Sequence, residues 1–306
     1  MVRRVEYAAM PAAEPASVPL PLLASPPASP LVEPRRYAPA AFGHAHDYHQ
    51  LLFGIDGALE LEVDGHAYRV DATHGLVIPA GAHHVCAGLV GNFQLVADFP
   101  PASVALPAGL MARPRAFALD GALAACVREL AAPPEVSAMG TAMGTAMGTA
   151  LNAPARCLPL QHAWQRAARL ATALAGRLGD AGSARFPVAA IDAYLRANLA
   201  TPVRADRLAA HFGWGARRFH ALFCEAFGDT PHAYQTRLRL DQAVQWLMAG
   251  EMPLLEIAFG VGYPDQTTFA RAFARRFGLP PGAWRGSISS KQATSPWTPR
   301  SARARL

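Results

Sequence analysis

The chain is poor in cysteine and has no long uncharged apolar stretch. Its four cysteines, Cys86, Cys126, Cys157 and Cys224, lie far apart among 306 residues and form no Cys-x-x-Cys pair. This excludes a disulfide framework or a cysteine zinc cluster and favours reduced thiols in a cytoplasmic protein. No apolar run reaches the roughly 18–20 residues that span a bilayer. The first residues, MVRRVEYAAMPAAEP, lack the apolar core of a secretory signal. We therefore expect a cytoplasmic protein without a membrane partner.

Lysine is nearly absent, since Lys291 is the only one, and the positive charge that arginine supplies is unevenly distributed. Residues 1–135 carry 8 basic and 13 acidic side chains, a net charge of −5. Residues 136–200 carry 6 against 2, and residues 201–306 carry 14 against 7, so these parts are +4 and +7. A basic C-terminal half favours a polyanionic partner, of which nucleic acid is the commonest.

Three segments have compositions that do not support a packed core. Residues 1–40 are rich in Pro, Ala and Ser and are predicted to be disordered. Residues 136–157 contain the repeat AMGTAMGTAMGTA and are predicted to be a low-complexity linker, because glycine at every fourth position penalises a helix. Residues 287–306 are predicted to be a disordered basic tail.

Residues 41–135 are predicted to form a small all-β domain. Short apolar or alternating runs between residues 47 and 99, such as HQLLFGI, LELEV and FQLVADF, read as strands. Asp56-Gly57 and Asp64-Gly65 separate the first three runs and have the preferred chemistry of tight hairpins. This spacing suggests an antiparallel β-barrel.

Residues 158–185 are predicted to form a helical linker. The apolar side chains of this segment share one helical stripe: Leu160, Trp164, Ala167, Leu170, Leu174 and Leu178. The stripe fits equally well a helix that packs on its own domain and a helix that forms a dimer.

Residues 186–286 are predicted to be all-helical and to contain one unit twice. FHALFCEAFGDTP at 219–231 and FARAFARRFGLPP at 269–281 each place phenylalanine at every fourth position and end in Gly-x-x-Pro. Such phenylalanines form a buried seam, and the glycine ends the helix. A short helix precedes each copy (LAAHFG and IAFGVG), which is the outline of a helix-turn-helix. Thr230 and Pro231 are predicted to open a connecting helix that runs to about Met248. The whole chain is thus of the α+β class.

These blocks resemble the AraC/XylS transcriptional regulators over about residues 186–286. The core Gly-Tyr-x-Asp-Gln-x-x-Phe-x-Arg-x-Phe, which begins at Gly262, is the most family-specific part. The resemblance implies two helix-turn-helix units joined by one long helix. In that arrangement two recognition helices enter successive major grooves about 34 Å apart.

The resemblance and the helical period together predict which side chains meet DNA: Arg217, Arg218, His220, Gln266, Thr267, Ala270 and Arg271. Gln266 has the amide for a bidentate contact to adenine, and Arg271 can bind guanine or phosphate. Gly215 stands where the family usually has a serine cap, and Ala221 where arginine is usual. We therefore expect weaker or altered readout by the first helix, with Arg217 contributing most of it.

Seven of the eleven histidines fall between His44 and His84. GHAHDYHQLLFGIDG at 43–57 and IPAGAHH at 78–84 resemble the two cupin motifs, with Gln50 in the place of the usual acid. The resemblance implies a sensory domain with effector-binding residues His44, His46, Gln50 and His84. Three interpretations stay open: a divalent metal on His44, His46 and His84 that His49 or Gln50 completes, an effector pocket without metal, or histidines that only fill the barrel interior.

The sequence thus predicts a DNA-binding transcriptional regulator, and more specifically an activator, under the control of a small-molecule effector in the barrel. No catalytic residue and no required cofactor are predicted. The expected partners are promoter DNA, the effector, RNA polymerase and a second copy of the chain. The alternative is a metal-dependent cupin enzyme or metal sensor fused to a DNA-binding domain.

Overall fold

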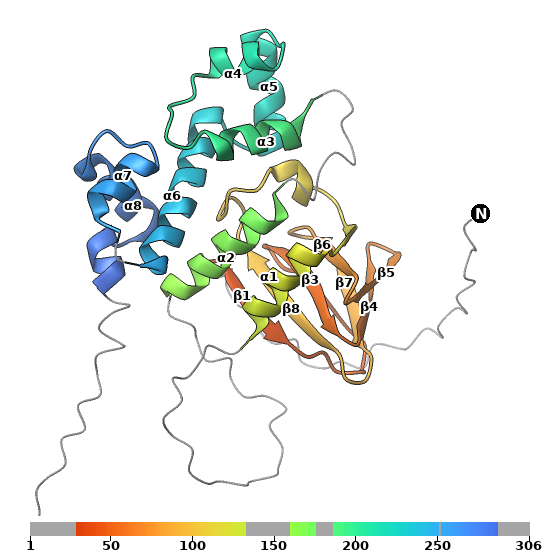
Figure 1. Ribbon diagram of the computed structural model, residues 1–306. Helices are drawn as coiled ribbons and strands as arrows, with labels where there is room; N and C mark the ends of the chain where they lie inside the picture. The colour runs from red at the N-terminus through yellow and green to blue at the C-terminus, as the bar shows by residue number, and fades with distance from the viewer. Residues whose placement is uncertain (1–28, 133–159, 176–185, 251, 287–306) are drawn as a thin grey trace, which may run out of the picture.

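The computed structural model describes residues 29–132, 160–175, 186–250 and 252–286. Within them the N-terminal part is a curled antiparallel sheet with helices on one face, and the C-terminal part is all-helical (Figure 1). The predicted α+β class is confirmed. The predicted linker at 136–157 and the tail at 287–306 lie outside the described residues. No helix among the described residues is long and apolar enough to cross a membrane.

The sheet of the described residues has nine strands in the order β1-β8-β3-β6-β5-β4-β7-β2, with β9 paired to β6. All of its pairs are antiparallel. The strands are β1 (Leu31–Arg35), β2 (Phe42–His44), β3 (His49–Asp56), β4 (Ala58–Val63), β5 (His66–Asp71), β6 (His74–Ile78), β7 (His84–Gly88), β8 (Phe93–Phe99) and β9 (Arg115–Ala118).

Strand β1 corrects the predicted disorder of residues 1–40 for the part that the structure describes, residues 29–40; residues 1–28 lie outside the described residues. Leu31–Arg35 pairs with β8 along its whole length, and Val32 is fully buried. The segment contains Pro34, which cannot donate to a ladder. Because β1 lies at one end of the sheet order, its proline is tolerated as it would not be in a central strand.

The two Asp-Gly pairs have different roles. Asp64 and Gly65 join the paired strands β4 and β5 with φ of 48° and 78°, as a tight hairpin requires. The predicted hairpin at Asp56-Gly57 is wrong, because β3 pairs with β6 and β8 and has no free edge for β4. Gly57 has a φ of 59°, and a Cβ there would lie 2.8 Å from the Asn92 backbone.

The two faces of the sheet have separate cores. On β3 and β8 the odd-numbered residues pack on helices, whereas Leu52 and Val96 face the interior of the curl. The covering helices are α1 (Gly121–Ala131) and α2 (Leu160–Leu174). Helix α2 also packs on α6, so its stripe is buried within the chain from Trp164 to Leu174, whereas Leu160 is exposed; Trp164 lies in the core of the helical domain. Residues 176–185 of the predicted helical linker lie outside the described residues.

The helical domain has six helices in the described residues, and it contains two helix-turn-helix units at either end of α6 (Figure 1). The helices are α3 (Val188–Ala197), α4 (Ala205–His211), α5 (Ala216–Phe227), α6 (Pro231–Ala249), α7 (Leu254–Gly260) and α8 (Gln266–Phe277). The Thr230 side chain caps α6 by accepting from the Ala233 N–H, with Pro231 in the first turn, as predicted.

Both recognition helices end at a left-handed glycine, Gly228 with φ of 70° and Gly278 with φ of 79°. We expect Gly278→Ala to lower the free energy of unfolding by about 1 kcal/mol, because a Cβ is disfavoured at this φ. No heavy atom lies within 4 Å of that Cβ, so the cost is one of backbone conformation. Urea denaturation would measure it, with Gly282→Ala as the control, since Gly282 has ordinary φ. If Gly278→Ala and Gly282→Ala changed the free energy of unfolding equally, the left-handed cap at Gly278 would not explain the loss.

The segment that follows β8 ties the sheet to the helical domain. Ala105 is fully buried in the core of the first helix-turn-helix unit. Its N–H donates to Asp241 on α6 (2.9 Å), and its carbonyl accepts from Arg196 on α3 (2.7 Å). Arg276 on α8 donates to the Ser103 carbonyl (2.9 Å) and to Asp241 (2.6 Å). One short segment thus contacts both helix-turn-helix units.

Candidate functional site

Helices α5 and α8 each have a buried aromatic side and an exposed polar side. Phe269, Phe273 and Phe277 are buried, with successive ring centroids 5.6 and 4.5 Å apart. The corresponding seam of α5 (Phe219, Phe223 and Phe227) has spacings of 5.8 and 4.0 Å. Since these seams fix the rotation of both helices, the opposite side of each is open to a partner.

The predicted DNA-contacting residues lie on these open sides. Gln266, Thr267 and Arg271 are exposed on α8, and Ala270 between them is partly buried. Asp265 caps α8 by accepting from the Thr268 N–H (2.7 Å). The cap places Gln266 and Thr267 in the first turn, the part of a recognition helix that reaches base edges.

The first recognition helix differs in its start and in its free side chains. Gly215 is its N-cap residue and supplies no side-chain hydrogen bond. Arg217, Arg218 and His220 are exposed, but the Arg218 guanidinium lies over the Trp214 ring, 5.3 Å from its centroid. Arg217 forms no ion pair within the described part of the chain, so it is the better placed of the two arginines to meet a phosphate or base.

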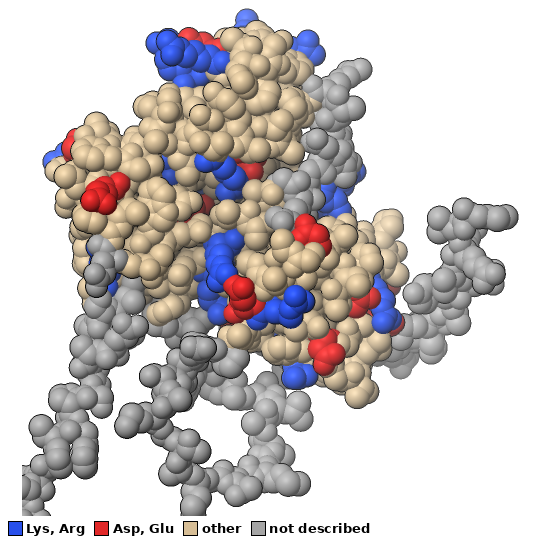
Figure 2. Space-filling model, in the orientation of Figure 1, with Lys and Arg blue, Asp and Glu red and all other residues tan. Residues whose placement is uncertain are grey.

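Arginines gather over α4 and α5 at the outer end of the first unit (Figure 2). On α8 the exposed Arg275 follows Arg271 by one helical turn and continues its basic side. The sequence analysis did not name Arg275. Its spacing from Arg271 is the signal that could have found it.

Two arginines of the connecting helix have structural partners, although the partners differ from those expected. Arg237 pairs with Asp229 (3.1 Å) and not with Asp241 or Glu225. Arg239 donates to the Leu199 carbonyl (2.8 Å) and lies over the Tyr263 ring. Neither belongs to the open sides of α5 and α8.

The curled sheet brings together three predicted histidines. His44 on β2 lies directly opposite His84 on β7, with ring centroids 4.2 Å apart. His46 follows β2, and its ring lies 5.0 Å from that of His84. Ligand-capable atoms of the three side chains all lie within 4.8 Å of one another. Such a cluster has the donor set of a divalent metal site.

Hydrogen bonds orient two of these rings. The carbonyls of Tyr48 and Ala82 accept from Nδ1 of His46 (2.7 Å) and His84 (3.2 Å). A carbonyl can only accept, so both rings carry their proton on Nδ1. Their Nε2 atoms are buried without a hydrogen-bond partner among the described residues. Burial lowers the pKa of all three histidines, that of His84 to about 4, so their lone pairs are available at neutral pH.

Gln50 and His49 do not complete this cluster. The Gln50 side chain donates to Asp98 on β8 (2.8 Å), and the other Asp98 oxygen accepts from Arg35 on β1 (2.6 Å). Asp98 thus lies beside Gln50 on the neighbouring strand, but it does not belong to the histidine cluster. His49 accepts from the Ala80 N–H and lines a different cavity.

The sequence analysis missed the other polar side chains of the barrel interior. Asp98 is buried on the same face as Val96, and Gln94 on that face is fully buried with both side-chain polar atoms unpaired among the described residues. An amide in a protein interior is stabilised by hydrogen-bond partners, so Gln94 can bind a polar group that enters the barrel. The signal was available, since two polar residues interrupt the apolar strand FQLVADF.

Comparisons with known proteins agree with this geometry. Residues 208–287 match the model of a family described as a helix-turn-helix domain. The probable transcriptional regulator LumQ of Photobacterium leiognathi is 26% identical over 238 residues, which are 78% of this chain and 89% of LumQ. The transcriptional activator RclR of Escherichia coli K12 is 42% identical over 70 residues, 23% of this chain and 25% of RclR. A solved AraC-type regulator from Chromobacterium violaceum is 24% identical over 34% of this chain and 89% of that chain, with a TM-score of 0.30.

The fold and the matched domain define a DNA-binding transcriptional regulator of the helix-turn-helix class. The chain resembles AraC-type regulators, and its double helix-turn-helix domain lies C-terminal to a curled antiparallel sheet.

Proposed function

We propose that this regulator binds promoter DNA in the cytoplasm by placing α5 and α8 in successive major grooves. The observation that carries the proposal is the position of Gln266 and Arg271 on the open side of α8, opposite the buried Phe269–Phe277 seam. Base and phosphate contacts need mobile polar side chains at such a surface. Helix α6 separates the two units and packs on α5 of the first and α7 of the second.

The experiment is selection of bound DNA from a randomised pool by the full-length protein. We expect an enriched sequence with two sub-sites about one helical turn, or 34 Å, apart. A single short site, or no enrichment, would argue against simultaneous binding by both helices. Genome-wide mapping of bound DNA in the cell of origin would then identify the regulated genes.

We further propose that a small molecule in the barrel controls DNA binding or promoter activity. Support comes from the buried polar groups of the interior, in particular the unpaired atoms of Gln94, His46 and His84. A ligand acts only through its different affinity for the two arrangements of the protein. We propose that the outcome is activation of transcription. The relative RclR is named a transcriptional activator. RNA polymerase contact and a homodimer, both implied by the family resemblance, remain predictions.

A divalent metal in the barrel is the second candidate function. His44, His46 and His84 would hold it through imidazole nitrogens. The Nδ1–H groups of His46 and His84 donate to backbone carbonyls, which would present Nε2 to the metal. A bound ion would supply positive charge for an anionic effector. If the metal-bound protein converts no substrate, it is a metal sensor. If it converts a substrate, it is a metal-dependent cupin enzyme.

We expect stoichiometric Co²⁺ or Zn²⁺ binding by calorimetry if the metal candidate is correct. His84→Ala should reduce the affinity at least about tenfold, because one ligand and its orientation are lost. His74→Ala is the matched control, since His74 is exposed in the same sheet. Equal affinities of the two variants would leave the metal-free effector pocket as the better candidate.

A further inference from the structure

Cys224 and His220 form a thiol–imidazole pair on the open side of α5. The Sγ atom of Cys224 lies 3.7 Å from Nδ1 and 4.0 Å from Nε2 of His220. The two residues are four positions apart, so their side chains lie one turn apart on the same side of the helix. His220 is exposed, Cys224 is partly buried, and the exposed Ala221 has no side chain long enough to cover them. The pair is therefore open to a ligand that approaches from solvent.

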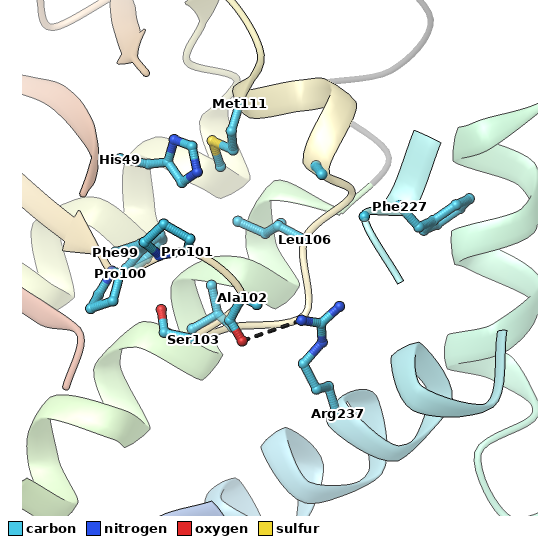
Figure 3. A pocket seen from close by; sticks show the side chains of 13 residues that line it. His49, Phe99, Pro100, Pro101, Ala102, Ser103, Leu106, Met111, Phe227 and Arg237 are labelled. Carbon is cyan, nitrogen blue, oxygen red and sulfur yellow. Dashed lines mark hydrogen bonds between the residues drawn. The ribbon is translucent and has the colours of Figure 1, made fainter. Parts of the chain in front are cut away.

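The packing of α5 keeps this pair on the outside. The phenylalanine seam on the opposite side of the helix is fully or almost fully buried. At the end of the helix, Phe227 lies beside a cavity of about 180 Å³ that Leu106 and Met111 of the sheet domain also line (Figure 3). Since α5 cannot turn about its axis without exposing the seam, the side that carries His220 and Cys224 stays accessible.

The distance between the two side chains suits a single metal ion. In a tetrahedral zinc site the Zn–S bond is about 2.3 Å and the Zn–N bond about 2.1 Å, which places the two ligand atoms about 3.6 Å apart. The Cys224 Sγ and His220 Nδ1 atoms are already 3.7 Å apart. The exposed His220 ring can turn about its side-chain torsions to direct a lone pair at the ion. Thiolate and imidazole ligands favour Zn²⁺ over Mg²⁺ or Ca²⁺.

We propose that Cys224 and His220 bind one Zn²⁺ ion on the first recognition helix. The Cys224 thiol loses its proton to solvent when sulfur binds the ion, so the bound group carries a net charge of about +1. Two positions of the tetrahedral ion remain open to water or to an oxygen or nitrogen atom of a partner. This site is separate from the cluster of three histidines in the sheet domain.

The ion would also act on DNA binding, and this part of the inference rests on the proposed function. The pair lies on the side of α5 that then faces the major groove, where a purine N7 or a phosphate oxygen can take an open position of the ion. One added positive charge releases about one more counter-ion, which corresponds to about fivefold tighter binding at about 0.15 M salt.

Cobalt titration of the full-length protein tests the site, because Co²⁺ accepts the same ligands as Zn²⁺ and absorbs strongly when it binds a thiolate. Calorimetry would also report a metal on the barrel histidines, whereas this absorption reports thiolate binding alone. We expect the absorption to saturate and to disappear when Zn²⁺ is added. Cys224→Ser should abolish it, and His220→Ala should weaken the Co²⁺ affinity at least about tenfold. No thiolate absorption in the unaltered protein would overturn the proposal.

Control variants locate the ion. Cys126→Ser removes a thiol of α1, and His232→Ala removes an exposed imidazole of α6, and both should keep the absorption. His84→Ala breaks the barrel cluster and should keep it as well. If the absorption survives in Cys224→Ser, another thiol binds the ion and the proposal is wrong. If His220→Ala binds Co²⁺ as tightly as the unaltered protein, the imidazole is not a ligand and the pair is not the site.

Fluorescence anisotropy with the selected DNA site then tests the effect on DNA. Zn²⁺ that saturates the site should tighten binding about fivefold and steepen the salt slope by about one ion, and Cys224→Ser should show neither change. An unchanged affinity, or an equal response of Cys224→Ser, would contradict the effect on DNA. If no DNA sequence is selected, the proposed function fails, whereas the cobalt titration still decides whether the ion binds.

Discussion

Asp241→Ala is expected to lower the free energy of unfolding by about 3–5 kcal/mol, as removal of one partner of a buried ion pair does. Asp241 is buried on α6, and its two oxygens accept from Arg276 and from the Ala105 N–H. Without the carboxylate, Arg276 keeps a buried charge with no counter-ion, and the Ala105 N–H loses its acceptor. Chemical denaturation of the full-length protein would measure the loss.

Two further variants give this prediction its controls. Asp241→Asn keeps an acceptor for Ala105 while removing the charge, so we expect a loss smaller than that of Asp241→Ala. Asp206→Ala removes a fully exposed partner of Arg204 and should leave stability essentially unchanged. A similar small effect of all three variants would mean that the interface at Asp241 contributes little.

The same variant tests the attachment between the domains. In the helical core, Asp241 accepts from the Ala105 N–H and Arg196 donates to the Ala105 carbonyl. Loss of one of these bonds should expose the segment after β8, and limited proteolysis near residues 100–111 should become faster. If the cleavage rate is unchanged while the free energy of unfolding falls strongly, the variant destabilises the helical domain alone and not its attachment to the sheet.

Local patterns predicted the parts of this fold that depend on near neighbours in sequence. Three of these patterns act within one or two helical turns: the phenylalanines four apart, the glycine after each seam, and Thr230 with Pro231. The helices and their ends can therefore be predicted without knowledge of the tertiary structure. The hairpin at Asp64-Gly65 is of the same kind. Asp56-Gly57 is the same dipeptide, but the strands that it joins, β3 and β4, do not pair. Both edges of β3 are already paired, with β6 and β8.

The remaining features depend on long-range contacts that a single sequence does not reveal. Strand β1 lies within a proline-rich stretch, and its partners, β8, α1 and α2, all come more than fifty residues later. Asp98 meets Gln50 because β3 and β8 are neighbours, so the hydrogen bond between them could not be predicted from the cupin spacing. The docking of Ala105 on Asp241 joins residues 136 positions apart. The histidine cluster could be predicted because two motifs with fixed internal spacing carry it.

On DNA, Arg271→Ala is expected to weaken specific binding by about 1–3 kcal/mol, and Gln266→Ala by a similar amount. Arg271 is exposed on α8 and forms no ion pair within the described residues, so its guanidinium is available to a base or phosphate. Fluorescence anisotropy at fixed salt with the selected site would measure the loss. Arg69→Ala is the matched control, because Arg69 is an exposed arginine of the sheet that pairs with Glu60 and Asp71.

Salt dependence and site specificity separate the two kinds of contact that Arg271 can make. If it binds phosphate, Arg271→Ala should weaken binding to all sequences alike and reduce the salt slope by about one ion. If it binds a base, the loss should be confined to sites with that base. Arg217→Ala on α5 should cost less sequence discrimination than Arg271→Ala, because α5 has Ala221 and an uncapped start at Gly215. A larger effect of Arg217→Ala would assign the dominant readout to the first helix.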